Sequence, residues 1–140
     1  MKDAISEVLE TMFFVMVDFP PAEKKTNQSY CESRIYLRQN RKRLEIGLQL
    51  GEGFAKMLTA NLLGKHELEV NADELQDAMK ELANMVGGSY LARLADGNWQ
   101  LGIPQFVSML KEERTFPAQI SLSFFGEYVG EVHLSSEVSG

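Results

Sequence analysis

Hydrophobic and polar residues recur along the chain with two different periods, which divide it into helical and extended segments. From Asp3 to about Met16, apolar residues return every three or four positions, a spacing typical of one buried helix face. The apolar residues of this segment are Ile5, Val8, Leu9, Met12 and Met16. After a loop with two prolines, the alternation in SYCESRIYLRQ and RLEIGLQL predicts two strands that pair as a hairpin.

Two further helices are expected in the middle of the chain. FAKMLTANLLG has an apolar face, and Gly64 is placed to cap its C-terminus. The longest periodic segment runs from about residue 72 to residue 94, and Asn71 or Asp73 can cap its N-terminus. At roughly 100° per residue, one side of this central helix is expected to face the core. That side consists of Leu75, Ala78, Met79, Leu82, Met85, Val86 and Ser89.

The C-terminal third of the chain is predicted to be extended. Three strand-like segments follow Asp96 and Gly97, namely NWQLGIPQFVSML, FPAQISLSFFG and EYVGEVHLSS. Gly126 and Glu127 are expected to form the hairpin turn between the last two. Helices and strands mix without the regular alternation of βαβ units, so the expected class is α+β. The 140 residues are expected to form a single domain, 1–140, with two long helices packed on a mostly antiparallel β-sheet.

The first helix and the central helix share a short pattern. Residues 3–10, DAISEVLE, align with residues 77–84, DAMKELAN, with Asp, Ala and Glu identical. This echo predicts an internal pseudo-duplication, with two halves related by a pseudo-two-fold axis. Chance similarity between two amphipathic helices is the alternative explanation. The last polar position differs, because Glu10 stands where the second copy has Asn84.

Composition excludes several classes of function. Lys and Arg number 14 against 20 Asp and Glu, and the resulting net charge of −6 argues against binding of nucleic acid. No apolar run approaches the roughly 20 residues of a membrane span, and the amphipathic start does not fit a signal peptide. We therefore expect a cytoplasmic protein that does not engage a membrane. The single cysteine, Cys31, and the widely separated His66 and His133 predict no disulfide and no metal site.

The side of the central helix opposite its apolar face carries a polar stripe. Asp77, Glu81, Asn84 and Gly88 follow one another at intervals of about one helical turn. Gly88 would let another protein's backbone approach the Asn84 amide closely. Its neighbour Gly87 is equally suited to close packing against the first helix, although each glycine costs about 1 kcal/mol relative to alanine. A solvated helix surface without function is the alternative explanation of this stripe.

The segment DAMKELANMVGGSY resembles the signature helix of the CheC, CheX and FliY chemotaxis phosphatases, which carry the motif Glu-x-x-Asn. GFAKMLTANLLG and LGIPQFV are similar to the family's short helix and to its Gly-x-Pro strand. CheC-like members have the motif in both long helices, and CheX-like members have it in the second only. Because the first helix here has Glu7 and Glu10 at those positions, the chain is similar to the CheX-like type. Glu7 is expected to be a solvated charge without a catalytic role.

This resemblance implies a hydrolase, a phosphatase that removes the phosphoryl group from the aspartate of a CheY-like response regulator receiver domain. It implies that Asn84 orients the attacking water and that Glu81 pairs with a receiver lysine, while Asp77 and Gly88 belong to the partner-binding surface. No cofactor of its own is expected, because Mg²⁺ would be held by the receiver. The pathway would be chemotaxis or another two-component system, and a homodimer is expected. The alternative is a receiver-binding or flagellar-switch-type adaptor of the same fold without catalysis.

Overall fold

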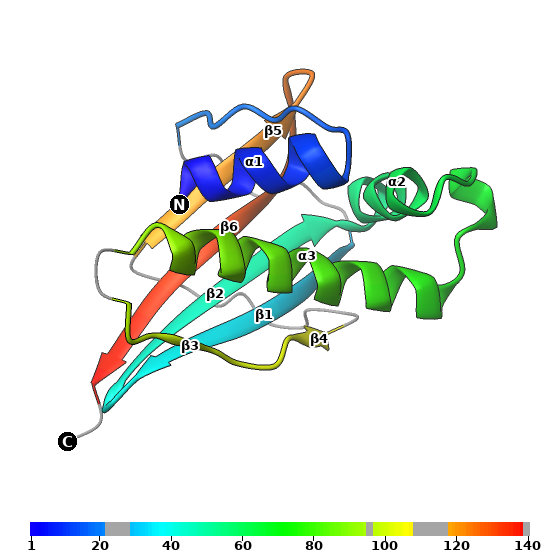
Figure 1. Cartoon of the computed structure of the whole chain (residues 1–140). Coiled ribbons are helices and arrows are strands. Elements are labelled where there is room, and N and C mark those ends of the chain that lie inside the picture. Colours follow the sequence, from blue (N-terminus) through cyan, green and yellow to red (C-terminus); the bar gives the residue numbers. More distant parts are fainter. Residues whose placement is uncertain (22–28, 95–96, 108–117, 139–140) are drawn as a thin grey trace.

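The computed structural model describes residues 1–21, 29–94, 97–107 and 118–138, which form helices and an antiparallel sheet (Figure 1). The helices are α1 (Lys2–Met12), α2 (Glu52–Leu63) and α3 (Ala72–Ala92), with a short 3-10 helix, η1 (Glu67–Glu69). The strands are β1 (Tyr30–Gln39), β2 (Lys42–Gly51), β3 (Gln100–Leu101), β4 (Gln105–Val107), β5 (Ala118–Phe124) and β6 (Glu127–Val138). The predicted α+β class is therefore confirmed.

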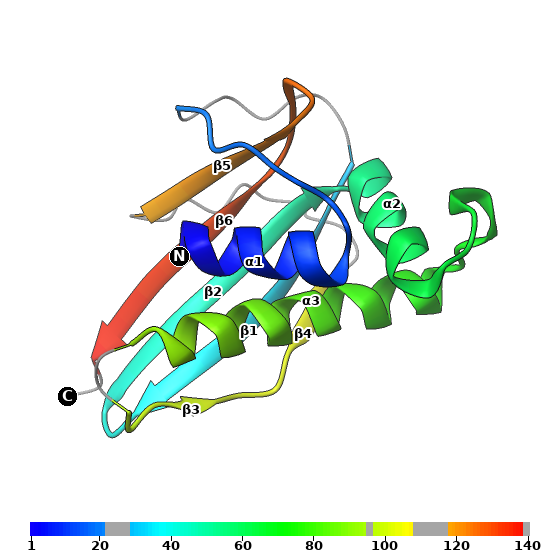
Figure 2. The same ribbon diagram turned by 45° about the horizontal axis from the view of Figure 1, so that its top comes forward.

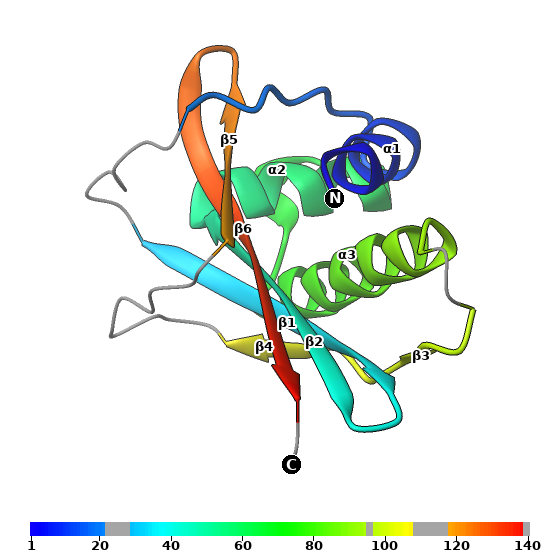
Figure 3. The same cartoon turned by 90° about the vertical axis from the view of Figure 1, so that its left-hand side faces the viewer.

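The strands form one sheet in the order β3-β1-β2-β6-β5, and β4 also pairs with β1. All of these pairings are antiparallel, and β1 and β2 form the expected hairpin. Helices α1 and α3 lie side by side on one face of the sheet (Figures 1 and 3). Among the described residues, no helix is long and apolar enough to span a bilayer.

Alternating strand residues and the inner helix faces build one apolar core between the two layers. The strand β2 contributes every second residue, as its sequence pattern predicts. Buried core side chains include Ile5, Leu9, Ile35, Leu37, Ile46, Leu48, Leu50, Leu58, Met79, Leu82, Val86 and Leu122. The apolar residues that alternate along β2 therefore lie on the face of the sheet that the helices cover.

Helix α3 begins with a capping box. The Asn71 side chain accepts a hydrogen bond from the Glu74 amide at 2.8 Å, and the Glu74 carboxylate accepts one from the Asn71 amide at 3.1 Å. Lys65 donates to the same carboxylate at 2.9 Å. These contacts hold the first turn of α3 against the end of the preceding segment, and they confirm Asn71 as the cap.

The buried side of α3 differs slightly from the predicted one. Five of the expected core residues, Leu75, Ala78, Met79, Leu82 and Val86, are buried, together with Ala83 and Gly87. Met85 is half-buried but also packs against the core, whereas the prediction was wrong for Ser89, which is half-buried and contacts Glu7 of α1. The buried side is shifted because β1 and β3 cover the flank of α3 that carries Gly87.

The first helix ends at Met12, four residues earlier than the sequence pattern predicts. Phe14 has a φ of 58°, a left-handed conformation that an α-helix of L-residues does not continue. The amides of Phe13 and Val15 both donate to the Leu9 carbonyl. In addition, the Asn61 side chain of α2 donates to the Phe13 carbonyl at 2.9 Å. A contact from a distant helix therefore helps to set where α1 stops.

The C-terminal strands also differ in detail from the prediction. The β5–β6 turn is Phe125–Gly126, one residue earlier than expected, and both residues have positive φ, 51° and 78°. This combination is typical of a two-residue hairpin turn that matches the twist of its strands. The segment NWQLGIPQFVSML contains two short strands, because residues 102–104 interrupt the pairing with β1. Its last three residues and the start of FPAQISLSFFG lie outside the described residues.

The two adjacent glycines of α3 have different surroundings. A Cβ atom on Gly87 would lie 2.9 Å from Leu101 Cδ1 and 3.0 Å from Ile35 Cγ2. A Cβ atom on Gly88 would have no neighbour within 4 Å. Gly87 therefore serves close packing, but against β1 and β3 and not against the first helix as the sequence suggested. Gly88 has no such packing role.

Alanine at these two positions is expected to change stability in opposite directions. Gly88→Ala should raise the free energy of unfolding by about 1 kcal/mol, because alanine favours the helix. Gly87→Ala should lower it by about 1 kcal/mol, because crowding against the buried Ile35 outweighs that gain. Urea unfolding followed by circular dichroism measures both changes. Equal stabilisation by the two substitutions would contradict the packing described for Gly87.

Cys31 lies in β1 and is buried under the helices. Burial raises the pKa of its thiol to about 12, with a further contribution from the negative charge of Glu52. The thiolate, which is the reactive form, is therefore almost absent at neutral pH. Cys31 is therefore poorly suited to act as a nucleophile in the folded protein.

The folded protein is expected to resist thiol reagents. At pH 8, Ellman's reagent should leave Cys31 unmodified over minutes, and unfolding in urea should release one reactive thiol per chain. The absorbance of the released thionitrobenzoate measures the reaction. Rapid modification of the folded protein would show that Cys31 is accessible.

Candidate functional site

The structure places the predicted polar stripe on the outer side of α3. Asp77 and Glu81 are exposed, and Asn84 and Gly88 are half-buried. Glu81 and Asn84 are three residues apart in a continuous helix, so their side chains leave the same face as neighbours. The carboxylate and the carboxamide are therefore available together at the surface.

Among the described residues, the Glu81 carboxylate and the Asn84 carboxamide have no polar partner. The contrast with Glu74 on the same helix is clear, because its carboxylate is bound by Lys65 and by the cap. Those hydrogen bonds lower the pKa of Glu74. Glu81 thus keeps its capacity to bind a cation from another molecule.

The polar stripe begins with acidic residues and ends at a glycine, which has no side chain. Asp77 and Glu81 lie in its N-terminal half, Asp73 lies one turn before it, and all three are exposed. Gly88 follows Asn84 by one turn and leaves open space beside the carboxamide. A basic group is therefore favoured near Glu81, and a bulky partner can approach Asn84 from the side of Gly88.

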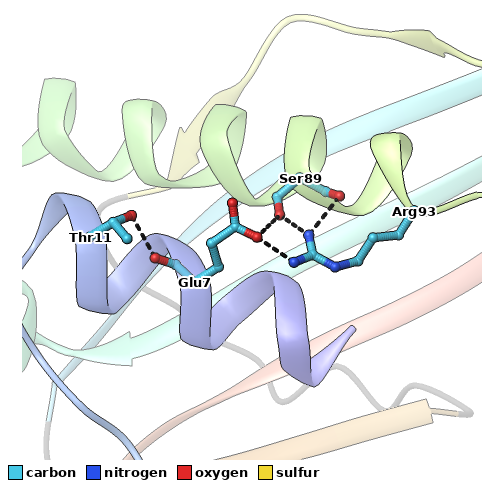
Figure 4. Close-up of polar contacts among 4 residues, drawn as sticks. All are labelled: Glu7, Thr11, Ser89 and Arg93. Carbon is cyan, nitrogen blue, oxygen red and sulfur yellow. Dashed lines mark hydrogen bonds and ion pairs between the residues drawn. The ribbon is translucent and has the colours of Figure 1, made fainter.

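The corresponding glutamate of α1 has a different environment (Figure 4). The Arg93 guanidinium donates hydrogen bonds to the Glu7 carboxylate and to the Ser89 hydroxyl, and it also donates to the Ser89 carbonyl at 3.0 Å. The Ser89 hydroxyl donates to Glu7 at 3.4 Å. Bonding to Arg93 lowers the pKa of Glu7. Glu7 is exposed, as expected of a solvated charge, but it also forms an ion pair between α1 and α3 that the sequence did not predict.

Sequence reasoning missed Arg93 and Ser89 as partners of Glu7. Glu7 and Arg93 are 86 positions apart, and no local pattern relates them. The echo between the two helices aligns Glu7 with Glu81 but does not say which residues of α3 lie opposite α1. The packing of the two helices supplies that information.

A cleft of about 630 Å³ lies elsewhere, between α2 and the β5–β6 hairpin. Its walls include Phe54, Met57 and Phe124, and Glu67 and Glu127 also line it. None of the stripe residues lines this cleft. In the described parts of the chain, no group of three His, Cys, Asp or Glu side chains is arranged to hold a metal ion.

Comparison with known proteins relates this chain to one family. The family described as chemotaxis phosphatase CheX matches residues 34–126, a region that includes α3 and its polar stripe. Comparison with curated protein sequences gave no match.

Solved structures share the fold at low sequence identity. The chemotaxis protein CheX from Vibrio vulnificus has a TM-score of 0.79 and 18% identity, covering 97% of this chain and 95% of that one. A chain of the CheX–CheY–BeF3–Mg²⁺ complex from Borrelia burgdorferi has a TM-score of 0.74 and 17% identity, covering 97% and 94%. The FliM middle domain from Helicobacter pylori has a TM-score of 0.52 and 10% identity, covering 94% and 82%.

The resemblance recognised in the helix DAMKELANMVGGSY is therefore confirmed at the level of the family. The matched region extends over most of the chain and includes the strands, the short helix and the central helix on which the resemblance was based. The chain belongs to the CheX family of chemotaxis phosphatases.

Proposed function

We propose that this protein hydrolyses the phospho-aspartate of a CheY-like response regulator receiver domain. The observation that carries the proposal is the pairing of an unengaged carboxylate, Glu81, with an unengaged carboxamide, Asn84, on the outer side of one rigid helix. Membership of the CheX family supports the reaction. The complex of a CheX with CheY, which shares this fold, supports the class of partner.

Asn84 is suited to position the attacking water. In this reaction the water oxygen bonds to phosphorus, the bond to the aspartate oxygen breaks, and inorganic phosphate leaves while the carboxylate is restored. Catalysis of phosphoryl transfer depends mainly on in-line positioning. A carboxamide offers both a donor and an acceptor and carries no charge. Asn84 can therefore hold the water without repelling the phosphoryl oxygens.

Glu81 is suited to fix the depth at which Asn84 enters the receiver. Its carboxylate lies one turn before Asn84 and can form a charge-assisted pair with a receiver lysine. Asp77, one turn earlier, extends the acidic edge of the contact. Gly88 leaves room for the receiver backbone beside the amide. Mg²⁺ would belong to the receiver, so the proposed reaction needs no cofactor from this chain.

Positioning of the water alone gives an expected acceleration of hydrolysis. If ordering one water removes on the order of 3 kcal/mol from the barrier, hydrolysis becomes about a hundredfold faster. Such a factor converts a slowly decaying phosphoryl group into a rapidly cleared one. Assembly as a homodimer stays a prediction that this reaction does not require.

A second candidate function is an adaptor that binds a receiver or a flagellar switch component without turnover. The fold similarity to the FliM middle domain favours it, although that likeness is weaker than the likeness to CheX. The carboxamide favours hydrolysis, because simple binding to a receiver lysine would need only the carboxylate of Glu81.

Substitution of Asn84 by alanine is expected to remove catalysis and to leave binding nearly intact. The water would no longer be oriented, so phosphate release from a phosphorylated receiver should fall by about a hundredfold. Gln76→Ala is the matched control, because it removes a half-buried carboxamide from the same helix outside the stripe. Activity of Asn84→Ala equal to that of wild type would exclude the proposed mechanism.

Substitution of Glu81 by lysine is expected to weaken binding. The change places two cations together at the contact, which should raise the dissociation constant of the receiver by at least about tenfold. Glu69→Lys alters the net charge equally at an exposed position of η1 and should have little effect. Calorimetric titration measures both constants. Similar affinities of the two variants would show that Glu81 does not contact the receiver.

A further inference from the structure

Large apolar side chains are exposed where α1 ends. Met12 is 41% exposed and Phe14 is 72% exposed. Their neighbour Phe13 is fully buried and packs in the core. The two exposed side chains have no such role within the described structure, and we refer to Met12 and Phe14 as the apolar pair.

The contacts between helices bring the end of α1 level with the part of α3 that carries the polar stripe. Helices α1 and α3 run antiparallel (Figures 1 and 2), and Glu7 lies opposite Ser89. Both helices rise about 1.5 Å per residue. Met12, five residues after Glu7, is therefore level with about Asn84, five residues before Ser89. Phe14 follows two residues later, just after α1 has ended.

A docked protein centred on the stripe would cover the apolar pair. Packed helices have axes about 8–10 Å apart. A stable protein interface buries about 800 Å² on each partner, a patch about 30 Å across. The interior of such a patch is normally enriched in aromatic residues and methionine. The polar stripe alone supplies no such residue, whereas the end of α1 supplies both kinds.

The backbone conformation of Phe14 belongs to the end of α1. Its φ of 58° stops the helix, and the next amide, that of Val15, donates to the Leu9 carbonyl. In this conformation Phe14 is 72% exposed. The left-handed backbone therefore serves the end of the helix, while the exposed side chain is available to a partner.

We propose that Met12 and Phe14 form the apolar part of the surface that docks the receiver domain, with Glu81 and Asn84 as its polar part. This inference rests on the proposed function and names the partner surface that would meet it, an apolar patch next to the receiver's phosphorylation site. The ion pair between Glu7 and Arg93 joins the two helices that carry these parts.

The chain contains a matched control for Phe14. Phe125 is also an exposed phenylalanine, at 89%, with a similar φ of 51°. Its conformation is required by the two-residue turn between β5 and β6. In Figure 1 that turn lies above α1, whereas α3 lies below it.

The experiment compares Phe14→Asn with Phe125→Asn. Asparagine tolerates a positive φ, so both variants should fold, and thermal unfolding checks this. The probes are CheY-like receivers activated with beryllofluoride for binding, or phosphorylated with acetyl phosphate for turnover. Phe14→Asn should raise the dissociation constant and KM about tenfold, with kcat little changed. Phe125→Asn should leave all three unchanged, and Met12→Gln should have a smaller effect than Phe14→Asn.

The outcomes separate this inference from the proposed function. Wild-type binding by Phe14→Asn, combined with an inactive Asn84→Ala, would overturn the apolar pair and leave the phosphatase intact. Binding that depends on Phe14 without any turnover would support the apolar pair and exclude the phosphatase. Failure of the wild-type protein both to bind and to dephosphorylate any receiver of a genome-wide panel would overturn both.

Discussion

Burial of the apolar side of α3, with Gly87 lying close to Ile35 and Leu101, sets the rotation of this helix about its axis, and the exposed stripe depends on that rotation. The other flank of the helix is held by the hydrogen bonds of Ser89 and Arg93 with Glu7 of α1. Between these two flanks, the side that carries Glu81 and Asn84 has no partner element among the described residues. The missing side chain of Gly87 thus allows the helix to lie close to the sheet while its polar side faces outward.

The glutamates at matching positions of α1 and α3 have different surroundings. Glu7 of α1 pairs with Arg93 of α3, whereas Glu81 of α3 has no partner among the described residues and can meet another molecule. A carboxylate that already holds a guanidinium has little left to offer a partner lysine. Together with the replacement of asparagine by Glu10, this leaves α3 as the one helix of the pair with an available Glu-x-x-Asn motif.

Periodicity and capping predicted most of this architecture because both are local. The outward positions of Glu81 and Asn84 could be predicted from the sequence of α3 alone. In a long, capped helix, the apolar and polar residues stay on opposite sides along its whole length. The end of α1 could not be predicted, because Phe14 adopts a left-handed conformation beside a residue that Asn61 of α2 holds. The residues that contact Gly87 and Glu7 could not be predicted either, since they depend on how distant segments of the chain pack together. The proposed apolar pair became visible only once α1 and α3 were placed side by side.

The most direct test of the central claim, that the free carboxamide and carboxylate of α3 carry out hydrolysis, is phosphate release with the phosphorylated receiver in large excess over this protein. The account predicts that each chain clears many receivers, so the rate of release rises in proportion to the amount of protein added. A rate equal to that of the receiver alone, whatever amount of the protein is present, would contradict it.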